Sequence, residues 1–231
     1  MKIGLQLAMP SEFRALPGAS SLTPFETISG VDFYRFSPDI IACTGGVGKV
    51  NAAMAAEILC LKYGVDLILN TGVAGCFTDL PTTSVVVASE LIQHDVDTTG
   101  VGDPIGLVST VNRVEFPTWQ PEHCVELLRR AGIEAVTGRV ATSDAFLTRG
   151  ERSQWVYDTF QPLLAEMEGC AIAQVCLRNG VPFVAVKSVS DHPFFENQAE
   201  EYNAFHEALD AAGQAAMALA AALVEEPAAK L

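Results

Sequence analysis

The chain has 231 residues, and its 14 basic and 28 acidic side chains give a formal net charge of −14. This balance argues against general binding to nucleic-acid phosphates or to an anionic membrane surface, because it supplies no basic face. Hydrophobic residues make up 49% and charged residues only 18% of the sequence, and a charged share below the usual level of about a quarter predicts a large core or a buried subunit interface.

The N-terminal half predicts strands, turns and one long helix. We expect strands over residues 2–8, 39–43, 65–69 and 84–88 and a helix over residues 50–62. Ser11 is placed to cap a short helix after the first strand. Residues 19–38 have the pattern of a hairpin with Gly30 in its turn, and the glycine-rich segments 44–49 and 70–75 are expected to be turns after strands.

The C-terminal half predicts a long loop followed by further alternation. Residues 94–118 are rich in Asp, Gly, Thr and Pro, which is typical of a loop. We expect helices over residues 124–131, 161–180 and 203–224 and strands over residues 134–142 and 181–188. Strands that alternate with helices predict one α/β domain over residues 1–231, with a parallel or mixed sheet covered on both faces.

Polar or glycine-rich residues follow several of the predicted strands. In chain order these are Glu12 and the segments 45–48, 72–75, 143–146 and 190–191. Because ligands of α/β sheets bind at the carboxyl ends of strands, we expect a small-molecule site there. The first glycine segment matches neither the G-x-x-x-x-G-K-[ST] nor the G-x-G-x-x-G pattern, so it predicts no triphosphate or dinucleotide. Its glycines fit a structural turn or a close approach of backbone to ligand.

Two acidic segments are candidate chemical groups of this site. Glu166 and Glu168 lie near the start of the helix predicted over residues 161–180. Side chains two residues apart on a helix point about 200° from each other, so we expect one glutamate in solvent and the other across the sheet edge. The pair equally fits helix-terminal acids favoured by the helix dipole. Asp191 ends a buried strand, where an acid is either a cap or a functional group.

The six cysteines form neither a CxxC pair nor a zinc-type cluster. Several lie in apolar runs, where a reduced thiol packs as a small hydrophobe, and this use of cysteine is typical of a cytoplasmic protein. A metal site at His94, Asp95 and Asp97 would need a second group of ligands that the sequence does not offer, so we expect no metal. The apolar runs are broken well before ~18 residues, so we expect no transmembrane helix.

Six motifs occur in a fixed order along the chain. They are M-K-I-G-x-x-x-A-M-x-x-E at residues 1–12, G-G-V-G-K-V-N-A-A at 45–53, N-T-G-V-A-G at 70–75, S-D-A-F at 143–146, E-M-E-G-C-A-I-A at 166–173 and K-S-V-S-D at 187–191. Together they resemble the 5′-methylthioadenosine/S-adenosylhomocysteine nucleosidases of the nucleoside phosphorylase superfamily. The resemblance covers the chain from its first residue to about the middle of the last predicted helix.

This resemblance implies a three-layer α/β fold of the nucleoside phosphorylase type, in which helices flank a mixed and partly closed central sheet. It implies a homodimer, in which a loop of the neighbouring subunit helps close the 5′ end of the pocket. It also implies hydrolysis of the N-glycosidic bond of methylthioadenosine and adenosylhomocysteine, which yields adenine and a 5-thioribose product in methionine salvage. No metal or organic cofactor is implied.

The resemblance assigns the chemistry to two acids. Glu12 would be the general base that orients or deprotonates the attacking water, and Asp191, helped by Ser190, would protonate or hydrogen-bond N7 of adenine. Cleavage of the bond builds positive charge on the ribose and negative charge on the leaving base. A carboxylate below the ring and an acid at the base meet these two demands. Asp191 would have to hold a proton near neutral pH, which requires a desolvated or charge-repelled site.

The remaining implied residues bind the substrate. Glu168 would bind the ribose hydroxyls, Met167 would pack against the sugar, and Met9 would line the ribose side. At the base and 5′ end, the resemblance implies Phe146 stacked on the purine, the main chain around Leu147 at the base edge, and Tyr202 or Phe205 as a cover.

The sequence departs from the family pattern at positions around the expected site of the attacking water. Val73 and Cys76 replace a serine and a glycine of the usual N-T-G-S-A-G-G turn, and Lys187 replaces the usual arginine. Lysine keeps the positive charge but loses the bidentate fork. These changes leave the arrangement around the nucleophilic water and the substrate preference open.

Three other activities remain as alternatives. A futalosine or aminodeoxyfutalosine hydrolase would share the fold and the hydrolytic chemistry. A phosphate-dependent purine nucleoside phosphorylase is disfavoured, because Val73 occupies the place of a phosphate-binding serine and no arginine follows the glycine segments. A non-catalytic nucleoside-binding protein is disfavoured by the presence of Glu12, Glu168 and Asp191.

Overall fold

The computed structural model describes residues 1–194 and 205–226, and a ten-stranded mixed sheet lies at its centre. The strands are β1 (Ile3–Leu7), β2 (Glu26–Ile28), β3 (Val31–Ser37), β4 (Ile40–Thr44), β5 (Leu67–Cys76), β6 (Val85–Gln93), β7 (Glu115–Pro117), β8 (Ala135–Thr142), β9 (Leu164–Glu166) and β10 (Phe183–Asp191). The helices are α1 (Pro10–Arg14), α2 (Lys49–Leu61), α3 (Pro121–Arg130), α4 (Glu151–Phe160), α5 (Gly169–Asn179) and α7 (Phe205–Glu225). Two short 3₁₀ helices lie at Ala19–Ser21 and Thr99–Val101.

The sheet is partly closed. Its strand order is β10-β6-β8-β9-β5-β1-β4-β3-β2, and β10 also pairs with β5. Strands β5, β10, β6, β8 and β9 therefore form a ring, and β1, β4, β3 and β2 extend from it as an open wing. The pairing of β10 is parallel to β5 and antiparallel to β6. The expected mixed, partly closed sheet is confirmed.

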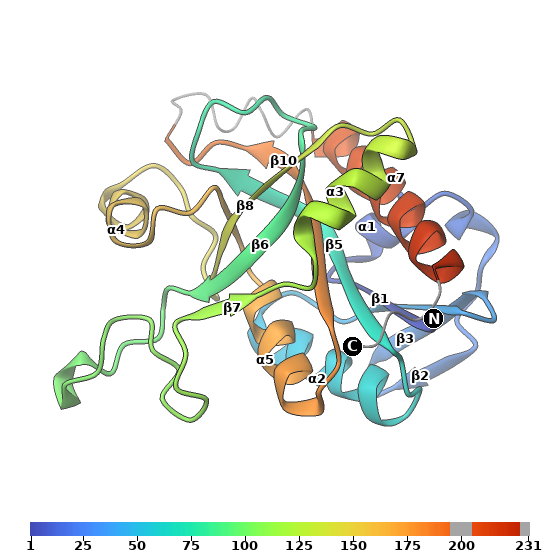
Figure 1. Ribbon diagram of the computed structural model, residues 1–231, viewed down its shortest axis with the longest axis horizontal. Helices are drawn as coiled ribbons and strands as arrows, with labels where there is room; N and C mark the ends of the chain where they lie inside the picture. The colour runs from blue at the N-terminus through green and yellow to red at the C-terminus, as the bar shows by residue number, and fades with distance from the viewer. Residues whose placement is uncertain (195–204, 227–231) are drawn as a thin grey trace.

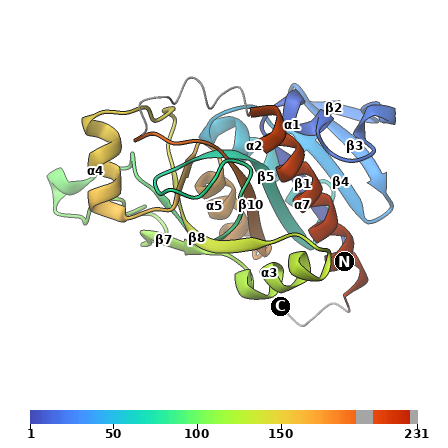
Figure 2. The same cartoon turned by 90° about the horizontal axis from the view of Figure 1, so that it is seen from above.

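Helices cover both faces of the sheet, as Figures 1 and 2 show. Helices α2 and α5 lie side by side on one face, where buried alanines such as Ala52, Ala55 and Ala56 let α2 approach the strands closely. Helices α1, α3 and α7 cover the other face. The expected α/β architecture, with helices on both sides of the sheet, is confirmed.

Helix α7 is long and apolar enough to cross a membrane by length and composition, but half of its most apolar window is buried in the protein. The buried residues of α7 pack against β5 and β10. The core therefore accounts for the apolar composition of this helix.

The glycine-rich segment 70–75 is not a turn, contrary to the prediction. It continues β5, where Gly72 pairs with Lys187 and Ala74 pairs with Val189 of β10. The prediction was wrong because the hydrogen-bond partner comes from a strand more than a hundred residues later in the chain. A non-local pairing overrides the local preference of glycine for turns.

The helix predicted over residues 161–180 is shorter than expected. Residues Leu164–Glu166 form β9, which pairs with β8 and β5, and α5 begins only at Gly169. Glu166 and Glu168 therefore lie on a strand end and at a helix N-cap. The 200° separation expected of two helical side chains does not apply to them.

Three smaller differences concern short elements. Ser11 does not cap α1, because the helix begins at Pro10 and Met9 is its N-cap residue. Proline fits this first helical position because its missing N–H would have no partner there. The loop predicted over residues 94–118 contains β7, and α4 was not predicted at all.

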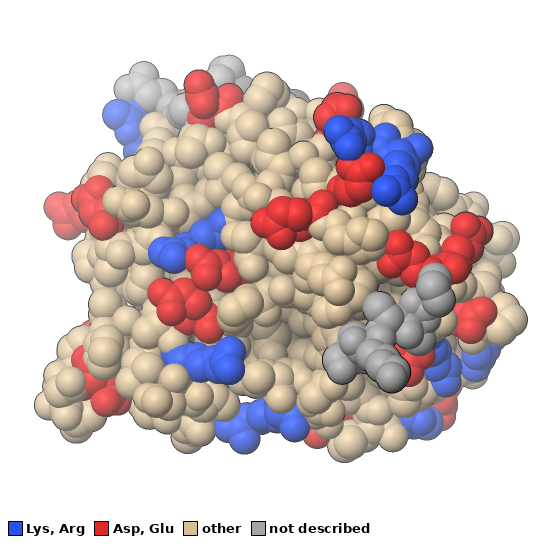
Figure 3. Space-filling view, viewed as in Figure 1, with Lys and Arg blue, Asp and Glu red and all other residues tan. Residues whose placement is uncertain are grey.

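Charged side chains are scattered over the surface. Figure 3 shows Lys and Arg in small separate groups among Asp, Glu and uncharged residues, with no continuous basic area on this face.

Candidate active site

A cavity of about 200 Å³ lies at the carboxyl ends of β1, β5 and β10. The predicted site residues on its wall are Met9, Glu12, Val73, Phe146, Met167, Glu168, Ser190, Asp191 and Phe205. Leu147 lines a small hollow that adjoins the cavity beside Asp191. Tyr202 lies outside the described residues. Segments far apart in the sequence thus meet at the sheet edge where the sequence placed a ligand.

A larger hollow of about 480 Å³ lies near Phe183, at the opposite end of β10. Its described lining holds no carboxylate, and none of the predicted site residues belongs to it. The smaller cavity is therefore the candidate active site.

Glu12 projects from α1 and is buried against β5. Its Oε2 atom accepts hydrogen bonds from the backbone N–H groups of Ala8 and Met9, both at 2.9 Å, and Oε1 accepts one from Val73 at 3.3 Å. Burial raises the pKa of Glu12 above its ordinary value, while Lys187 and the three N–H groups oppose the shift without cancelling it. The result is a fixed carboxylate with an enhanced affinity for a proton.

Gly72 makes room for this carboxylate. A Cβ atom on Gly72 would lie 2.2 Å from Oε1 of Glu12, and the residue has a φ of +147°, which disfavours side chains. Only glycine at this point of β5 lets Glu12 reach the backbone N–H of Val73.

Glu168 is the N-cap residue of α5. Its Oε1 atom accepts a hydrogen bond of 2.9 Å from the backbone N–H of Gly48, the residue before α2. Burial first, and the neighbouring charge of Glu166 second, raise the pKa of Glu168 to about 7, although Lys187 acts in the opposite direction. The first glycine segment is thus more than a turn, because it binds a site carboxylate.

Lys187 lies behind the cavity wall and is paired with Glu166. The Nζ atom of Lys187 is 3.1 Å from Oε2 of Glu166, and both side chains are buried. Burial lowers the pKa of Lys187, but the carboxylates of Glu166, Glu168 and Glu12 outweigh burial and raise it. Lys187 is therefore a charged group at neutral pH, and it offsets part of the negative charge around it.

Glu166 was a candidate together with Glu168, but the sequence assigned it no role in the site. It was expected that one of the two glutamates faces solvent, but both are buried. The backbone N–H groups of Glu168 and Gly169 donate to Oε2 of Glu166 at 3.1 and 2.8 Å. Glu166 thus connects the start of α5 to Lys187 on β10. Recognition of 164–166 as a strand would have shown that Glu166 points inward.

Asp191 ends β10 and is buried in the cavity wall. The hydroxyl of Ser190 donates to Oδ1 of Asp191 at 2.7 Å, and the carbonyl oxygen of Ala74 lies 3.3 Å from the same hydroxyl. The serine thereby orients the carboxyl group. Phe146, by contrast, is 61% exposed at the edge of the cavity, where its ring is available to a planar ligand.

Comparison with known proteins agrees with this fold and site. The family model described as the phosphorylase superfamily matches residues 2–225. A 5′-methylthioadenosine/S-adenosylhomocysteine nucleosidase of Shewanella putrefaciens is 37% identical over 202 residues, which cover 83% of this chain and 86% of the relative.

Two solved structures show the same architecture. A methylthioadenosine/adenosylhomocysteine nucleosidase of Colwellia psychrerythraea in complex with adenine has a TM-score of 0.82 and 33% identity, with 96% of each chain covered. Futalosine hydrolase of Helicobacter pylori has a TM-score of 0.86 and 26% identity, with 95% of this chain and 97% of that chain covered.

The ring-closed sheet and the carboxylate-lined cavity define a member of the nucleoside-cleaving α/β proteins. The chain belongs to the phosphorylase superfamily and, within it, to the family of 5′-methylthioadenosine/S-adenosylhomocysteine nucleosidases.

Proposed function

We propose that the protein hydrolyses the N-glycosidic bond of 5′-methylthioadenosine and S-adenosylhomocysteine to adenine and the 5-thioribose product, a step of methionine salvage. One observation carries this proposal: Glu12, Glu168 and Asp191 line a single cavity at the carboxyl ends of the strands. The similarity to nucleosidases over most of the chain supports the choice of substrates.

The proposed reaction uses water as nucleophile. Glu12 accepts a proton from the water, because its raised pKa makes it a better base than an exposed glutamate. The water oxygen forms a bond to C1′ while the bond from C1′ to N9 of the base breaks. The electron pair of that bond passes to the purine, and Asp191 supplies a proton or a hydrogen bond to N7. The reaction as written needs no metal or organic cofactor.

The other residues of the site bind the substrate and stabilise the charge that develops on it. Glu168 accepts hydrogen bonds from the ribose hydroxyls, and the negative charge of its ionised form stabilises the positive charge that develops on the ring. Lys187 keeps the neighbouring carboxylates from repelling one another. Met9 and Met167 pack on the sugar, and Phe146 stacks on the purine, while Leu147 meets the base edge through its main chain and Ser190 orients Asp191.

Futalosine hydrolysis is the second candidate, and the structural similarity to a futalosine hydrolase favours it. Phosphorolysis has less support, because no arginine is among the described residues of the cavity wall and Val73 offers no hydroxyl. The two hydrolytic candidates differ in substrate and not in chemistry, so the assay has to compare substrates.

The test is base release from methylthioadenosine, adenosylhomocysteine, futalosine and inosine, in phosphate-free buffer and then with phosphate. We expect adenine from the first two substrates without phosphate. Release from futalosine alone would replace the proposal by the futalosine reaction. A strict requirement for phosphate would overturn hydrolysis, and retention of intact nucleoside would indicate a binding protein.

We further propose a homodimer. Large apolar side chains are exposed along α2 and the turn before it, with Val50 80%, Leu61 71% and Val47 44% exposed. Val47 also lines the cavity, so a partner that covers this surface would lie beside the substrate. Light scattering after gel filtration should give twice the mass of the chain, and a monomer at micromolar concentration would refute the dimer.

We also propose that the protein is located in the cytoplasm. All six cysteines are free, and five of them are buried. Reduced thiols of this kind are typical of a reducing compartment. Fractionation of the native source should recover the activity with cytoplasmic markers, and recovery in a membrane or secreted fraction would contradict it.

A further inference from the structure

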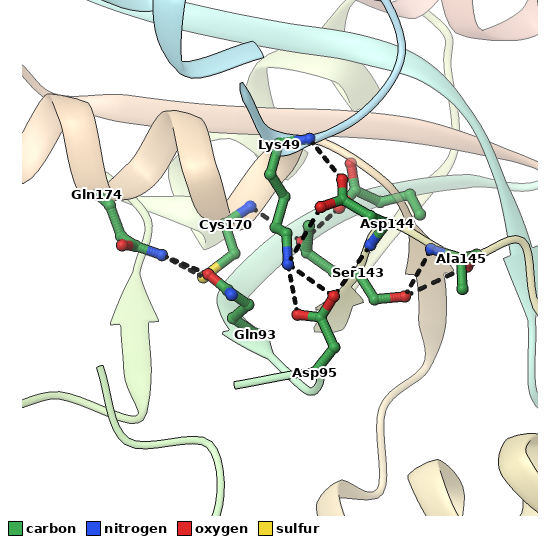
Figure 4. A network of polar contacts seen from close by, with 10 residues as sticks. Lys49, Gln93, Asp95, Ser143, Asp144, Ala145, Cys170 and Gln174 are labelled. Atoms are coloured by element: carbon green, nitrogen blue, oxygen red, sulfur yellow. Dashed lines mark hydrogen bonds and ion pairs between the residues drawn. The ribbon is translucent and has the colours of Figure 1, made fainter. Parts of the chain in front are cut away.

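Three charged residues form a network beside the active-site cavity without lining it. Lys49 begins α2, Asp95 follows β6, and Asp144 follows β8. The Nζ atom of Lys49 lies 2.6 Å from both carboxylate oxygens of Asp95 and 3.4 Å from Oδ2 of Asp144. Figure 4 shows the lysine side chain held between the two aspartates. We call these three residues the latch.

Backbone hydrogen bonds complete the latch. The N–H of Lys49 donates to Oδ1 of Asp144 at 2.8 Å, and the N–H of Asp144 donates to Oδ2 of Asp95 at 3.1 Å. Each residue therefore contacts the other two, so the latch ties three separate segments of the chain together. Side-chain exposure is 17% for Lys49 and 18% for Asp95, so solvent screens this pair less than an ordinary surface pair.

The latch borders two parts of the candidate site. Gly48 precedes Lys49, and its N–H binds Oε1 of Glu168 at 2.9 Å. The consecutive N–H groups of Gly48 and Lys49 at the start of α2 thus bind Glu168 and the latch residue Asp144, respectively. On the other side, Asp144 lies two residues before Phe146, which is at the edge of the cavity and largely exposed.

Lys49 also balances charge within the latch. Burial raises the pKa of Asp95, but the contacts with Lys49 and with the N–H of Asp144 outweigh burial and lower it. Asp95 is therefore ionised near neutral pH. Without the ammonium group, two carboxylates would face each other with no counter-charge, and the loop that carries Phe146 would move away from α2.

We propose that Lys49, Asp95 and Asp144 are positioning residues of the nucleosidase, which hold the Phe146 loop over the base and Gly48 against Glu168. This inference rests on the proposed function, because it assigns Phe146 to the base and Glu168 to the ribose. The latch touches no substrate and acts only through these two neighbours.

The test compares Lys49→Met and Asp95→Asn with Lys62→Met, a matched control at the other end of α2 whose ammonium group pairs with Glu26 at the surface. In both latch variants we expect KM for methylthioadenosine to rise at least fivefold, while kcat falls less than threefold because Glu12 and Asp191 are untouched. The dissociation constant of adenine, measured by calorimetry, should also rise at least fivefold. The control should stay within twofold of the wild type, and so should Lys49→Arg, which keeps the charge.

Unchanged KM and adenine affinity in folded latch variants would overturn the proposal. If Asp95→Asn does not fold, Lys49→Met decides, since it removes the same ion pair. Failure of both to fold would also overturn it, because the three residues would then determine the fold and not the position of the ligand. A wild-type protein that releases no base would refute the proposed function, whereas an active wild type with unaffected latch variants would refute only the latch.

Discussion

The Nζ atom of Lys187 lies 3.1 Å from Oε2 of Glu166, and neither side chain is more than 2% exposed. The charges of Glu12 and Glu168 also act on this lysine. One buried ammonium group behind the cavity wall thus acts on three carboxylates that line the cavity. A site that stabilises a positively charged ribose benefits from this excess of negative charge. The same excess destabilises the folded protein at neutral pH unless a positive charge such as that of Lys187 offsets it.

The first prediction is that Lys187→Met destabilises the protein more at high pH than at low pH. Loss of one partner of a buried ion pair costs roughly 3–5 kcal/mol. Because the abandoned carboxylates can take up protons, the cost in free energy of unfolding should shrink as the pH falls from 8 to 5. Urea unfolding at both pH values measures this difference.

Lys62→Met is the matched control for this prediction. Lys62 pairs with Glu26 at the surface, so its loss should cost less than about 1 kcal/mol at either pH. An equal loss of stability for Lys187→Met at pH 5 and pH 8 would show that charge repulsion among the carboxylates is not the cause.

The sequence predicted those parts of the fold that depend on local pattern. Alternating apolar strands and alanine-rich helices indicated the layers, and polar strand ends indicated where the cavity lies. The family motifs then indicated which residues line it. Phe146 and Asp191 are 45 residues apart in the chain, yet both line the cavity, because each follows or ends a strand of the same sheet.

Non-local pairing explains the errors. From the local sequence, Gly72 was predicted to lie in a turn and Glu166 in a helix. The structure places both in strands, because Gly72 pairs with β10 and Leu164–Glu166 pairs with β8 and β5. The latch was also not predicted, because Lys49, Asp95 and Asp144 come from three segments, and the motifs that contain Lys49 and Asp144 do not indicate that the two residues meet. An ion pair between two loops leaves no periodic pattern in a single sequence, so the sequence alone does not reveal it.

The second prediction concerns Glu168 and pH. Its pKa rises from 4.5 in the unfolded chain to about 7 in the folded protein, so the folded state holds the proton more tightly. This contribution to stability is complete below pH 4.5 and is lost as the pH rises through 7, on the order of 3 kcal/mol in all. Glu168→Gln should remove this loss and flatten the free energy of unfolding between pH 5 and pH 8.

Glu26→Gln is a suitable control for Glu168→Gln. Glu26 is partly exposed, and its hydrogen bond to Lys62 lowers its pKa, so any effect of Glu26 on stability is confined to pH values below 5. Urea titrations of the three proteins at several pH values give the comparison. If Glu168→Gln keeps the full pH dependence of the wild type, the raised pKa belongs to another group.

The third prediction is that Gly72→Ala abolishes hydrolysis. The new Cβ would lie 2.2 Å from Oε1 of Glu12, so the carboxylate has to leave the N–H of Val73. Gly100→Ala is the control, because nothing lies within 4 Å of a Cβ there. We expect at least a hundredfold loss of kcat for Gly72→Ala and none for Gly100→Ala, measured as adenine release. Normal turnover by Gly72→Ala would show that Glu12 needs no fixed position.

The fourth prediction is that Asp191→Asn loses turnover and stays folded. The amide keeps the shape of the carboxyl group and can still accept the hydrogen bond from Ser190, but it has no acidic proton for N7 of the base. Adenine release should fall at least a thousandfold, while circular dichroism and the melting temperature remain close to those of the wild type. Wild-type activity in this variant would remove Asp191 as the acid.

The fifth prediction separates binding from chemistry at Glu12. In Glu12→Gln the amide oxygen can replace one carboxylate oxygen toward Ala8 and Met9, but the amide nitrogen then faces the N–H donor of Val73. We expect a loss of about 1–3 kcal/mol in stability from this unmatched donor, a folded protein, and no measurable hydrolysis. Calorimetry with methylthioadenosine should still detect binding, since Glu168, Asp191 and Phe146 are unchanged. Loss of binding together with residual turnover would make Glu12 a binding residue, and another group would have to be the base.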